Sequence, residues 1–122
     1  MSDEERIQEA MKIILFAGNA RVHCMNALRA IEDENIDLAH VEMKLSNQEI
    51  VSAHKIQTNA ISEETQGKKT EYSLLFAHAQ DTLMTIYSEI NITKRLIKIF
   101  EKQQKQYTQF EKRLAKLEEE RN

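Results

Sequence analysis

The sequence predicts an all-α protein, an antiparallel bundle of three long helices with an extended C-terminal helix. Two observations lead to this prediction. The 122 residues include no proline and only two glycines, Gly18 and Gly67, so residues that usually interrupt helices and form tight turns are scarce. Apolar residues make up 41% of the chain and charged residues 30%, which suits amphipathic helices around a core better than a disordered segment.

The composition also restricts the compartment and the partners. No apolar run approaches the roughly 20 residues that span a bilayer, and the acidic residues 3–5 differ from the basic start of a signal peptide. The single cysteine, Cys24, cannot form an internal disulfide, which agrees with a reducing compartment. A net charge of −3 gives no general attraction to nucleic acid. We therefore expect a cytoplasmic protein that neither binds nucleic acid nor inserts into a membrane.

The first predicted helix covers about residues 4–31, where apolar residues form two stripes at helical spacing. One stripe contains Ile7, Met11, Ile14, Gly18, Met25 and Leu28, and the other contains Ile13, Phe16, Ala20, Cys24, Ala27 and Ile31. Glycine in mid-helix costs about 1 kcal/mol relative to alanine, so we interpret Gly18 as a place where another helix approaches closely. The polar residues 32–35 end the helix and reverse the chain.

The second predicted helix covers about residues 37–66. Asn35 or Asp37 can cap it, since either side chain can accept a hydrogen bond from an unpaired backbone amide. Gly67 is the expected C-terminal stop. The expected apolar positions are Leu38, Val41, Leu45, Ile50, Ala53, Ile56, Ala60 and Ile61.

The third predicted helix begins near Glu71, with Thr70 as its cap. A heptad seam with spacings of four and three consists of Tyr72, Phe76, Ala79, Leu83, Ile86, Ile90, Thr93, Ile97 and Phe100. A second stripe lies roughly 110 degrees around the helix and contains Leu74, Leu75, His78, Asp81, Thr82, Thr85, Ile92 and Leu96. Because a lone three-helix bundle covers only one of the two, we expect the second stripe to be a subunit interface with a polar site.

Beyond Phe100 the chain is rich in Glu, Lys and Gln. Apolar residues nevertheless continue at spacings of three, four and three, at Tyr107, Phe110, Leu114 and Leu117. A third helix that continues to Glu120 is roughly 75 Å long at 1.5 Å per residue, and it extends past the other two. We therefore divide the chain into a three-helix domain, residues 1–103, and a charged helical extension, residues 104–122.

Residues 74–85, Leu-Leu-Phe-Ala-His-Ala-Gln-Asp-Thr-Leu-Met-Thr, resemble the active-site helix of a known family. The family is the lactose/cellobiose (diacetylchitobiose) enzyme IIA components of the bacterial phosphoenolpyruvate-dependent sugar phosphotransferase system, whose pattern reads approximately His-(Ala/Gly)-Gln-Asp-His-Leu-Met. Segments 16–21, 53–58 and 67–71 resemble further parts of that family. They occur in the same order, so the resemblance covers about residues 5–100.

The resemblance implies that His78 accepts a phosphoryl group from phospho-HPr and passes it to the cysteine of enzyme IIB during uptake of a β-linked disaccharide. Imidazole suits this role because its pKa near 6.5 leaves a neutral nucleophilic nitrogen at cytosolic pH. Gln80 would donate an amide hydrogen bond to the phosphoryl group. On its own helix it points away from His78, so this contact would cross a subunit boundary. Association with the membrane component, enzyme IIC, would run only through enzyme IIB.

The resemblance further implies a homotrimer, a nine-helix bundle in which Asp81 of three subunits shares one Mg²⁺ ion. Three such carboxylates would repel one another without a cation. Thr82 departs from the family pattern, which usually has a second histidine there, and a hydroxyl cannot carry positive charge. Its effect on transfer stays open, as do the sugar and the identity of the metal.

Two other functions stay open. The charged extension and the absence of a glycine-rich phosphate loop favour a structural or adaptor coiled-coil protein without phosphotransfer activity. Residues 37–40, Asp-Leu-Ala-His, resemble half of a carboxylate-histidine metal site, but a di-iron bundle needs two Glu-x-x-His motifs and further glutamates. We expect His23, His40 and His54 to be structural or exposed, and Cys24 to be a packed thiol.

Overall fold

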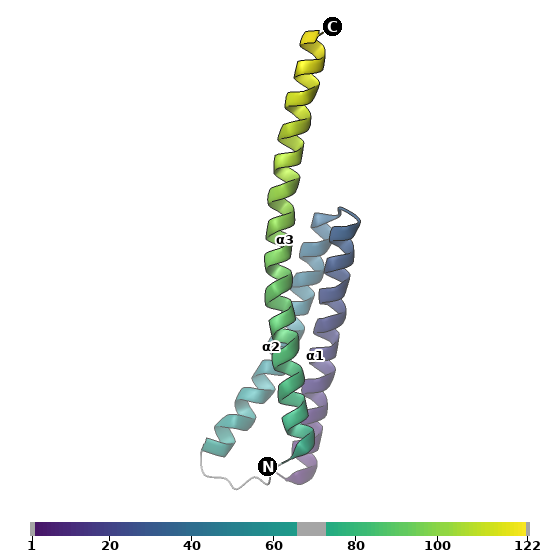
Figure 1. Ribbon diagram of the computed structural model, residues 1–122. Helices are drawn as coiled ribbons and strands as arrows, with labels where there is room; N and C mark the ends of the chain where they lie inside the picture. Colours follow the sequence, from purple (N-terminus) through teal and green to yellow (C-terminus); the bar gives the residue numbers. More distant parts are fainter. Residues whose placement is uncertain (1, 66–72, 122) are drawn as a thin grey trace.

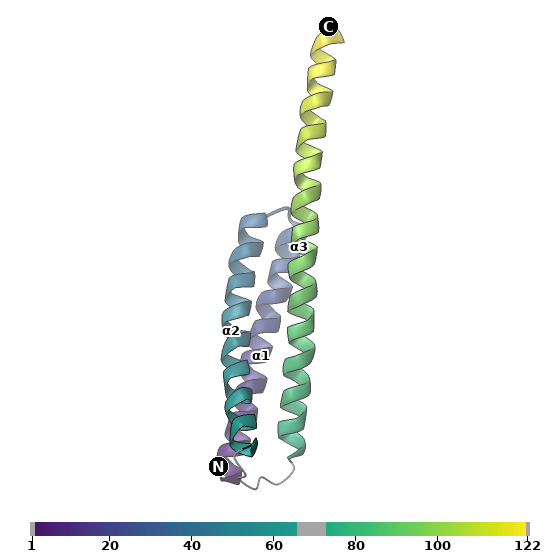
Figure 2. The same cartoon turned by 90° about the vertical axis from the view of Figure 1, so that its left-hand side faces the viewer.

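The structure is a computed structural model that describes residues 2–65 and 73–121. It contains three helices, α1 (Asp3–Glu32), α2 (Ile36–Thr65) and α3 (Leu74–Arg121). Helices α1 and α3 run in the same direction and α2 runs opposite to both (Figure 1). Two perpendicular views show α3 projecting far beyond the connection between α1 and α2 (Figure 2). The predicted all-α bundle with an extended C-terminal helix is confirmed, whereas its assembly into a trimer stays a prediction.

Side chains define the first two helix starts. The hydroxyl of Ser2 accepts a hydrogen bond from the Glu5 amide at 3.2 Å, and the Glu5 carboxylate accepts one from the Ser2 amide at 3.4 Å. Of the two caps predicted for α2, Asn35 is the one used, because its Oδ1 accepts a hydrogen bond from the Leu38 amide at 3.1 Å. Glu34, with a φ of 59°, makes the reversal before it.

The predicted start of α3 near Glu71 is wrong. The helix begins at Leu74, because the Ser73 hydroxyl accepts a hydrogen bond from the Phe76 amide at 3.2 Å and the Ser73 carbonyl accepts one from the Ala77 amide. The cap proposed at Thr70, the stop proposed at Gly67 and the first seam position, Tyr72, lie outside the described residues.

The predicted seam of α3 is confirmed from Phe76 to Ile97, all of it buried, with Phe100 half-buried at its end. Against this seam α1 presents a buried face made mostly of small residues: Ala10, Ile13, Ala17, Ala20, Cys24, Ala27 and Ala30. Of the two stripes predicted for α1, the one containing Ile13 and Cys24 therefore belongs to the core. Ile7, Met11 and Met25 of the other stripe are exposed.

Only half of the apolar positions expected on α2 belong to the core. Ile50, Ala53 and Ala60 are buried and Ile56 is partly buried, but Leu38, Val41, Leu45 and Ile61 are exposed. The other buried positions of α2 are the small Ala39, the apolar Met43 and the polar Ser46 and Gln57. The hydroxyl of Ser46 donates to the Ala20 carbonyl of α1 at 2.7 Å, so the alanine-rich face of α1 holds a polar side chain without leaving it unpaired.

The interpretation of Gly18 as a point of close helix approach is wrong for the single chain. A Cβ atom placed on Gly18 would meet nothing within 4 Å.

Two further findings concern the whole chain. Within the described ranges, no helix is both long and apolar enough to cross a membrane. Helix α3 passes through residues 103 and 104 without a break, so the division into domains at that point stays a prediction.

Candidate functional site

The predicted acceptor, His78, is the fifth residue of α3, one turn beyond the first unpaired backbone amides of the helix. Its flanks are fixed by the core, because Phe76 and Ala79 are buried. The imidazole is exposed, and the structure gives it no hydrogen-bond partner among residues 2–65 and 73–121. An incoming group can therefore reach its ring nitrogens without displacing a bond within the chain.

The structure separates His78 from the second predicted site residue, Gln80, which is half-buried. Residues two apart on a helix point about 200 degrees from each other, so one copy of the chain cannot bring this amide to the imidazole of its own His78. The expectation that Gln80 points away from His78 is consistent with this helix. A contact between them requires a second copy.

Asp81 follows His78 by three residues and lies on the same exposed face of α3. Among the residues that the structure places, no group of three or more His, Cys, Asp or Glu side chains comes together in a way that could hold a metal ion. Within the described residues, Asp81 is therefore not part of a complete metal site in a single subunit. The predicted Mg²⁺ ion would need Asp81 carboxylates from other copies of the chain. The di-iron alternative based on residues 37–40 likewise lacks the additional ligands it needs in the described part of the chain.

Thr82 is already engaged within its own helix. Its hydroxyl donates a hydrogen bond to the carbonyl oxygen of His78 at 2.8 Å. The proton of that hydroxyl consequently points along the backbone, so it is not directed at the His78 ring.

Arg6 and Glu9 of α1 lie at the same end of the bundle as His78. The guanidinium of Arg6 stacks over the Phe76 ring, with 4.9 Å between its carbon and the ring centroid. Burial raises the pKa of Glu9, and the neighbouring carboxylates Glu63 and Glu5 raise it further, against a partial opposing effect of Lys12. One carboxylate oxygen of Glu9 and one of Glu63 are buried without a partner in the described part.

The other histidines differ from His78 in their surroundings. His23 Nδ1 of α1 lies 2.6 Å from a carboxylate oxygen of Glu42 on α2. His40 of α2 pairs with Glu101 of α3. Both rings therefore join helices, as the sequence predicted for structural histidines. His54 is exposed and resembles His78 in having no partner within the described ranges.

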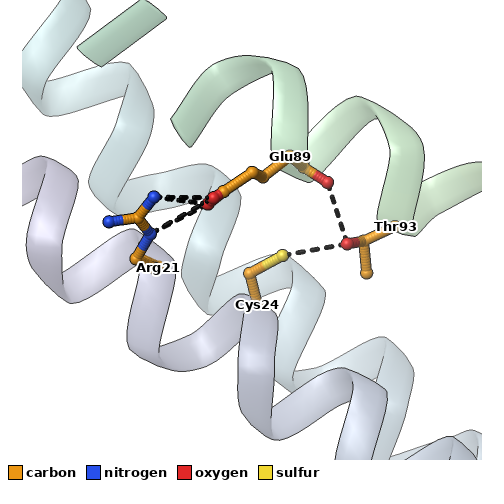
Figure 3. A network of polar contacts seen from close by, with 4 residues as sticks. All are labelled: Arg21, Cys24, Glu89 and Thr93. Carbon is orange, nitrogen blue, oxygen red and sulfur yellow. Dashed lines mark hydrogen bonds and ion pairs between the residues drawn. The ribbon is translucent and has the colours of Figure 1, made fainter. Parts of the chain in front are cut away.

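A polar network that runs from the surface into the core joins α1 to α3 (Figure 3). Arg21 donates to both carboxylate oxygens of Glu89, with its shortest contacts at 2.8 Å, and this pairing lowers the pKa of Glu89. The buried Cys24 thiol donates to the Thr93 hydroxyl at 3.1 Å, and that hydroxyl donates to the Glu89 carbonyl at 2.8 Å. Desolvation raises the pKa of Cys24, so the predicted packed thiol is confirmed.

Sequence reasoning missed the partner of Arg21. The residue belongs to segment 16–21, which carries part of the family resemblance, but helical periodicity does not show which side chain of α3 it meets. Arg21 is exposed, so neither its residue type nor its place on the helix gave a signal for this contact.

Comparison with known proteins agrees with this geometry. Residues 8–101 match the family model of the PTS system, Lactose/Cellobiose specific IIA subunit. The chain is 36% identical over 91 residues to the lactose-specific EIIA component of Staphylococcus epidermidis, which covers 75% of this chain and 88% of that protein. Among solved structures, PtcA from S. mutans superposes with a TM-score of 0.81 at 31% identity, over 83% of this chain and 99% of that chain.

A second solved structure, the IIA(Chitobiose)-HPr complex of N,N'-diacetylchitobiose, superposes with a TM-score of 0.72 at 27% identity, over 85% of this chain and 99% of that chain. Together, the fold and these likenesses define a phosphotransferase component that carries phosphoryl groups. The chain belongs to the lactose/cellobiose-specific IIA family of the sugar phosphotransferase system.

Proposed function

We propose that His78 carries the phosphoryl group, accepting it from phospho-HPr and delivering it to the cysteine of the cognate enzyme IIB in the cytosol, during uptake of a β-linked disaccharide. The observation that carries this proposal is the exposure of the His78 imidazole and its lack of a hydrogen bond within the described residues. His78 is exposed and unbonded in the described structure on the helix that matches the family, whereas His23 and His40 are held by carboxylates. The HPr complex of a structural relative supports the donor.

The transfer requires positioning more than acid or base groups. A neutral nitrogen of His78 attacks phosphorus as the bond from phosphorus to the donor imidazole nitrogen breaks, and the electron pair stays with the donor ring. The thiolate of enzyme IIB then attacks phosphorus, and the His78 ring leaves. The buried neighbours Phe76 and Ala79 keep the ring on the outer face during both steps.

We further propose a homotrimer in which the exposed stripe of α3 is the subunit interface. Leu74, Ile92 and Leu96 on this helix and Ile7 and Met11 on α1 are large apolar side chains that the chain's own helices leave exposed. In such an assembly, the amide of Gln80 from one subunit would serve the phosphoryl group on His78 of another. That arrangement removes the conflict posed by their opposite directions on α3.

The trimer would bring three Asp81 carboxylates together around one Mg²⁺ ion. The exposed position of Asp81 fits this role, because a carboxylate on the outer face of one chain can meet its copies. When bound, the ion would neutralise three like charges and so stabilise the assembly. Asp81 belongs to this interface and takes no part in the transfer itself.

The test is phosphorylation by phosphoenolpyruvate, enzyme I and HPr, followed by intact mass measurement. The wild-type chain and His54→Gln should each gain one acid-labile phosphoryl group, and His78→Gln should gain none. His54→Gln is the matched control, because both rings are exposed and unbonded in the described structure. Gln80→Ala should slow the transfer while leaving the mass of the assembly unchanged. Full acid-labile labelling of His78→Gln would reject the assignment.

A further inference from the structure

Within residues 2–65 and 73–121, no element covers the last third of α3. From Lys105 to Arg121 every residue is exposed, and both views show this part of the helix standing alone (Figures 1 and 2). The match to the family model ends at residue 101, so this extension is not part of what the family shares. The turn between α1 and α2 lies beside the first part of the extension. There Glu34 lines a shallow groove with Phe100 and Tyr107, and Ile36 lines another with residues of α3 up to Lys112.

Large apolar side chains lie along one side of this bare segment. The exposed fractions are 64% for Tyr107, 69% for Phe110, 50% for Leu114 and 62% for Leu117. Their spacings are those of heptad positions a and d, with Tyr107 and Leu114 at a and Phe110 and Leu117 at d. We call these four residues the tail stripe.

The tail stripe continues an exposed line on the body of the molecule. Position d, counted back from Phe110, falls on Gln103 and then on Leu96, which is 45% exposed. Position a, counted back from Tyr107, falls on the half-buried Phe100. A neighbouring helix that covers Leu96 can therefore continue along the tail without changing its heptad register.

The flanking charges indicate the direction of the neighbour. In a parallel coiled coil, a g residue faces the e residue five positions further along the other chain. Arg113 at g then faces Glu118 at e of the neighbour, which is a favourable pair. In an antiparallel coiled coil, e positions face e and g positions face g. The antiparallel register that keeps all four tail-stripe residues in contact would therefore bring Glu111 against Glu111 and Arg113 against Arg113 of the other chain.

We propose that residues 96–121 of α3 associate with the same segment of other copies of this chain as a parallel, in-register coiled coil. The tail stripe forms its interface, and Arg113 of each chain pairs with Glu118 of the next. The partner is a second copy because it presents the same stripe at the same height, and in the parallel, in-register arrangement Arg113 faces Glu118. The inference does not depend on whether His78 carries a phosphoryl group.

Disulfide trapping of the full chain tests direction and register together. Leu117→Cys at position d should form a disulfide between copies under mild oxidation, because parallel, in-register helices place residue 117 beside its own counterpart. Lys112→Cys at position f, on the outer side of the same helix, should not. The native Cys24 is buried and does not interfere. If both variants were trapped equally, or if neither were trapped, the proposal would be overturned. Binding of the tail to a different protein would not change that conclusion.

A charge exchange tests the predicted pair, read as the rate of disulfide formation in the Leu117→Cys background. Arg113→Glu should slow trapping several-fold, because it sets Glu against Glu118 of the neighbour, and adding Glu118→Arg should restore the rate. The control exchange, Lys112→Glu with Glu119→Lys, changes the same charges at f positions and should have no effect. Failure of the double variant to recover would refute the parallel Arg113–Glu118 contact.

Discussion

Four histidines with nearly the same intrinsic chemistry have different surroundings in this bundle. His23 and His40 each bind a carboxylate of another helix, and both contacts lie toward the end of the bundle where the chain reverses between α1 and α2. His78 lies toward the opposite end, next to the cap at Ser73. The neighbouring residues therefore determine whether each imidazole is held by a carboxylate or is open to an incoming group.

Thr82 provides a test of how the site works without the family's usual second histidine. Because its hydroxyl donates to the His78 carbonyl, Thr82→Val should leave the rate of phosphoryl transfer nearly unchanged. Transfer from phospho-HPr under single-turnover conditions is the measurement. A loss of about tenfold or more, worth about 1.4 kcal/mol in the barrier, would mean that the hydroxyl acts on the phosphoryl group instead.

Cys24 should be nearly inert in the folded protein. Burial hides its sulfur and raises its pKa, so both access and the thiolate fraction are reduced. An aromatic disulfide reagent at mildly alkaline pH should react slower by about an order of magnitude or more with the folded chain than with the chain in guanidinium chloride. Similar rates in the two states would contradict the packed position of the thiol.

Helical elements differ in how far their sequences determine their faces. The α3 seam was predictable because Phe76, Leu83 and Ile90 are large apolar residues at regular spacing. On α2 the same reasoning failed, since Ser46 and Gln57 are buried while Leu45 and Val41 are exposed. A hydrophobic residue is expected to be shielded from water. Its hydrophobicity does not tell whether the shield is the core of its own subunit or an interface with another subunit.

The candidate site also has features that the sequence predicted and features that it did not. The exposed face shared by His78 and Asp81 follows from their separation of three residues on a helix. The start of α3 at Leu74 did not follow, because Thr70 and Ser73 are both residue types that cap helices well and the sequence alone does not choose between them. The pairing of Arg21 with Glu89 depends on how α1 and α3 align, which periodicity does not specify.

The contact between α1 and α2 near Glu9 should make stability depend on pH. A raised pKa means that the folded chain holds this proton more tightly than the unfolded chain, so stability falls as pH rises through the ordinary glutamate value of 4.5 and the raised value above it. Glu9→Gln should therefore raise the melting temperature at pH 7, and the gain should vanish below pH 4.5. Glu119→Gln on the exposed tail is the control. A lower melting temperature for Glu9→Gln at pH 7 would contradict this sign.

At the scale of the whole molecule, the proposed trimer has a direct readout. Light scattering at micromolar concentration should give three times the chain mass of 14.3 kDa. The exposed apolar residues of α1 and α3 support this proposal, because a monomer would leave both rows in water. A mass of one chain at that concentration would be incompatible with the proposal.

Removal of divalent metal should loosen the assembly. If Asp81 carboxylates share an Mg²⁺ ion, a chelator should lower the melting temperature of the wild-type protein, and Asp81→Leu should abolish that sensitivity by removing the repelling charges. Asp37→Leu, which removes an exposed carboxylate from α2, should keep the wild-type response. Equal responses of all three proteins would place any metal effect elsewhere.

Truncation should separate the extension from the transfer function. Deleting residues 104–122 should lower thermal stability, because the paired tails contribute to the assembled state, yet leave His78 phosphorylation intact. Scanning calorimetry and intact mass after phosphorylation measure the two effects independently. An unchanged melting temperature would show that the tails do not stabilise the folded protein.

The continuity of α3 also has a practical consequence for experiments. The 44 residues from His78 to Arg121 form one uninterrupted helix, about 65 Å in length at 1.5 Å per residue. A fluorescent protein or surface tether attached after Asn122 would therefore stand well clear of any partner bound at His78. Single cysteines introduced at successive positions along this helix would also lie at known distances from one another. Crosslinking from each position could then show where on the protein each partner binds.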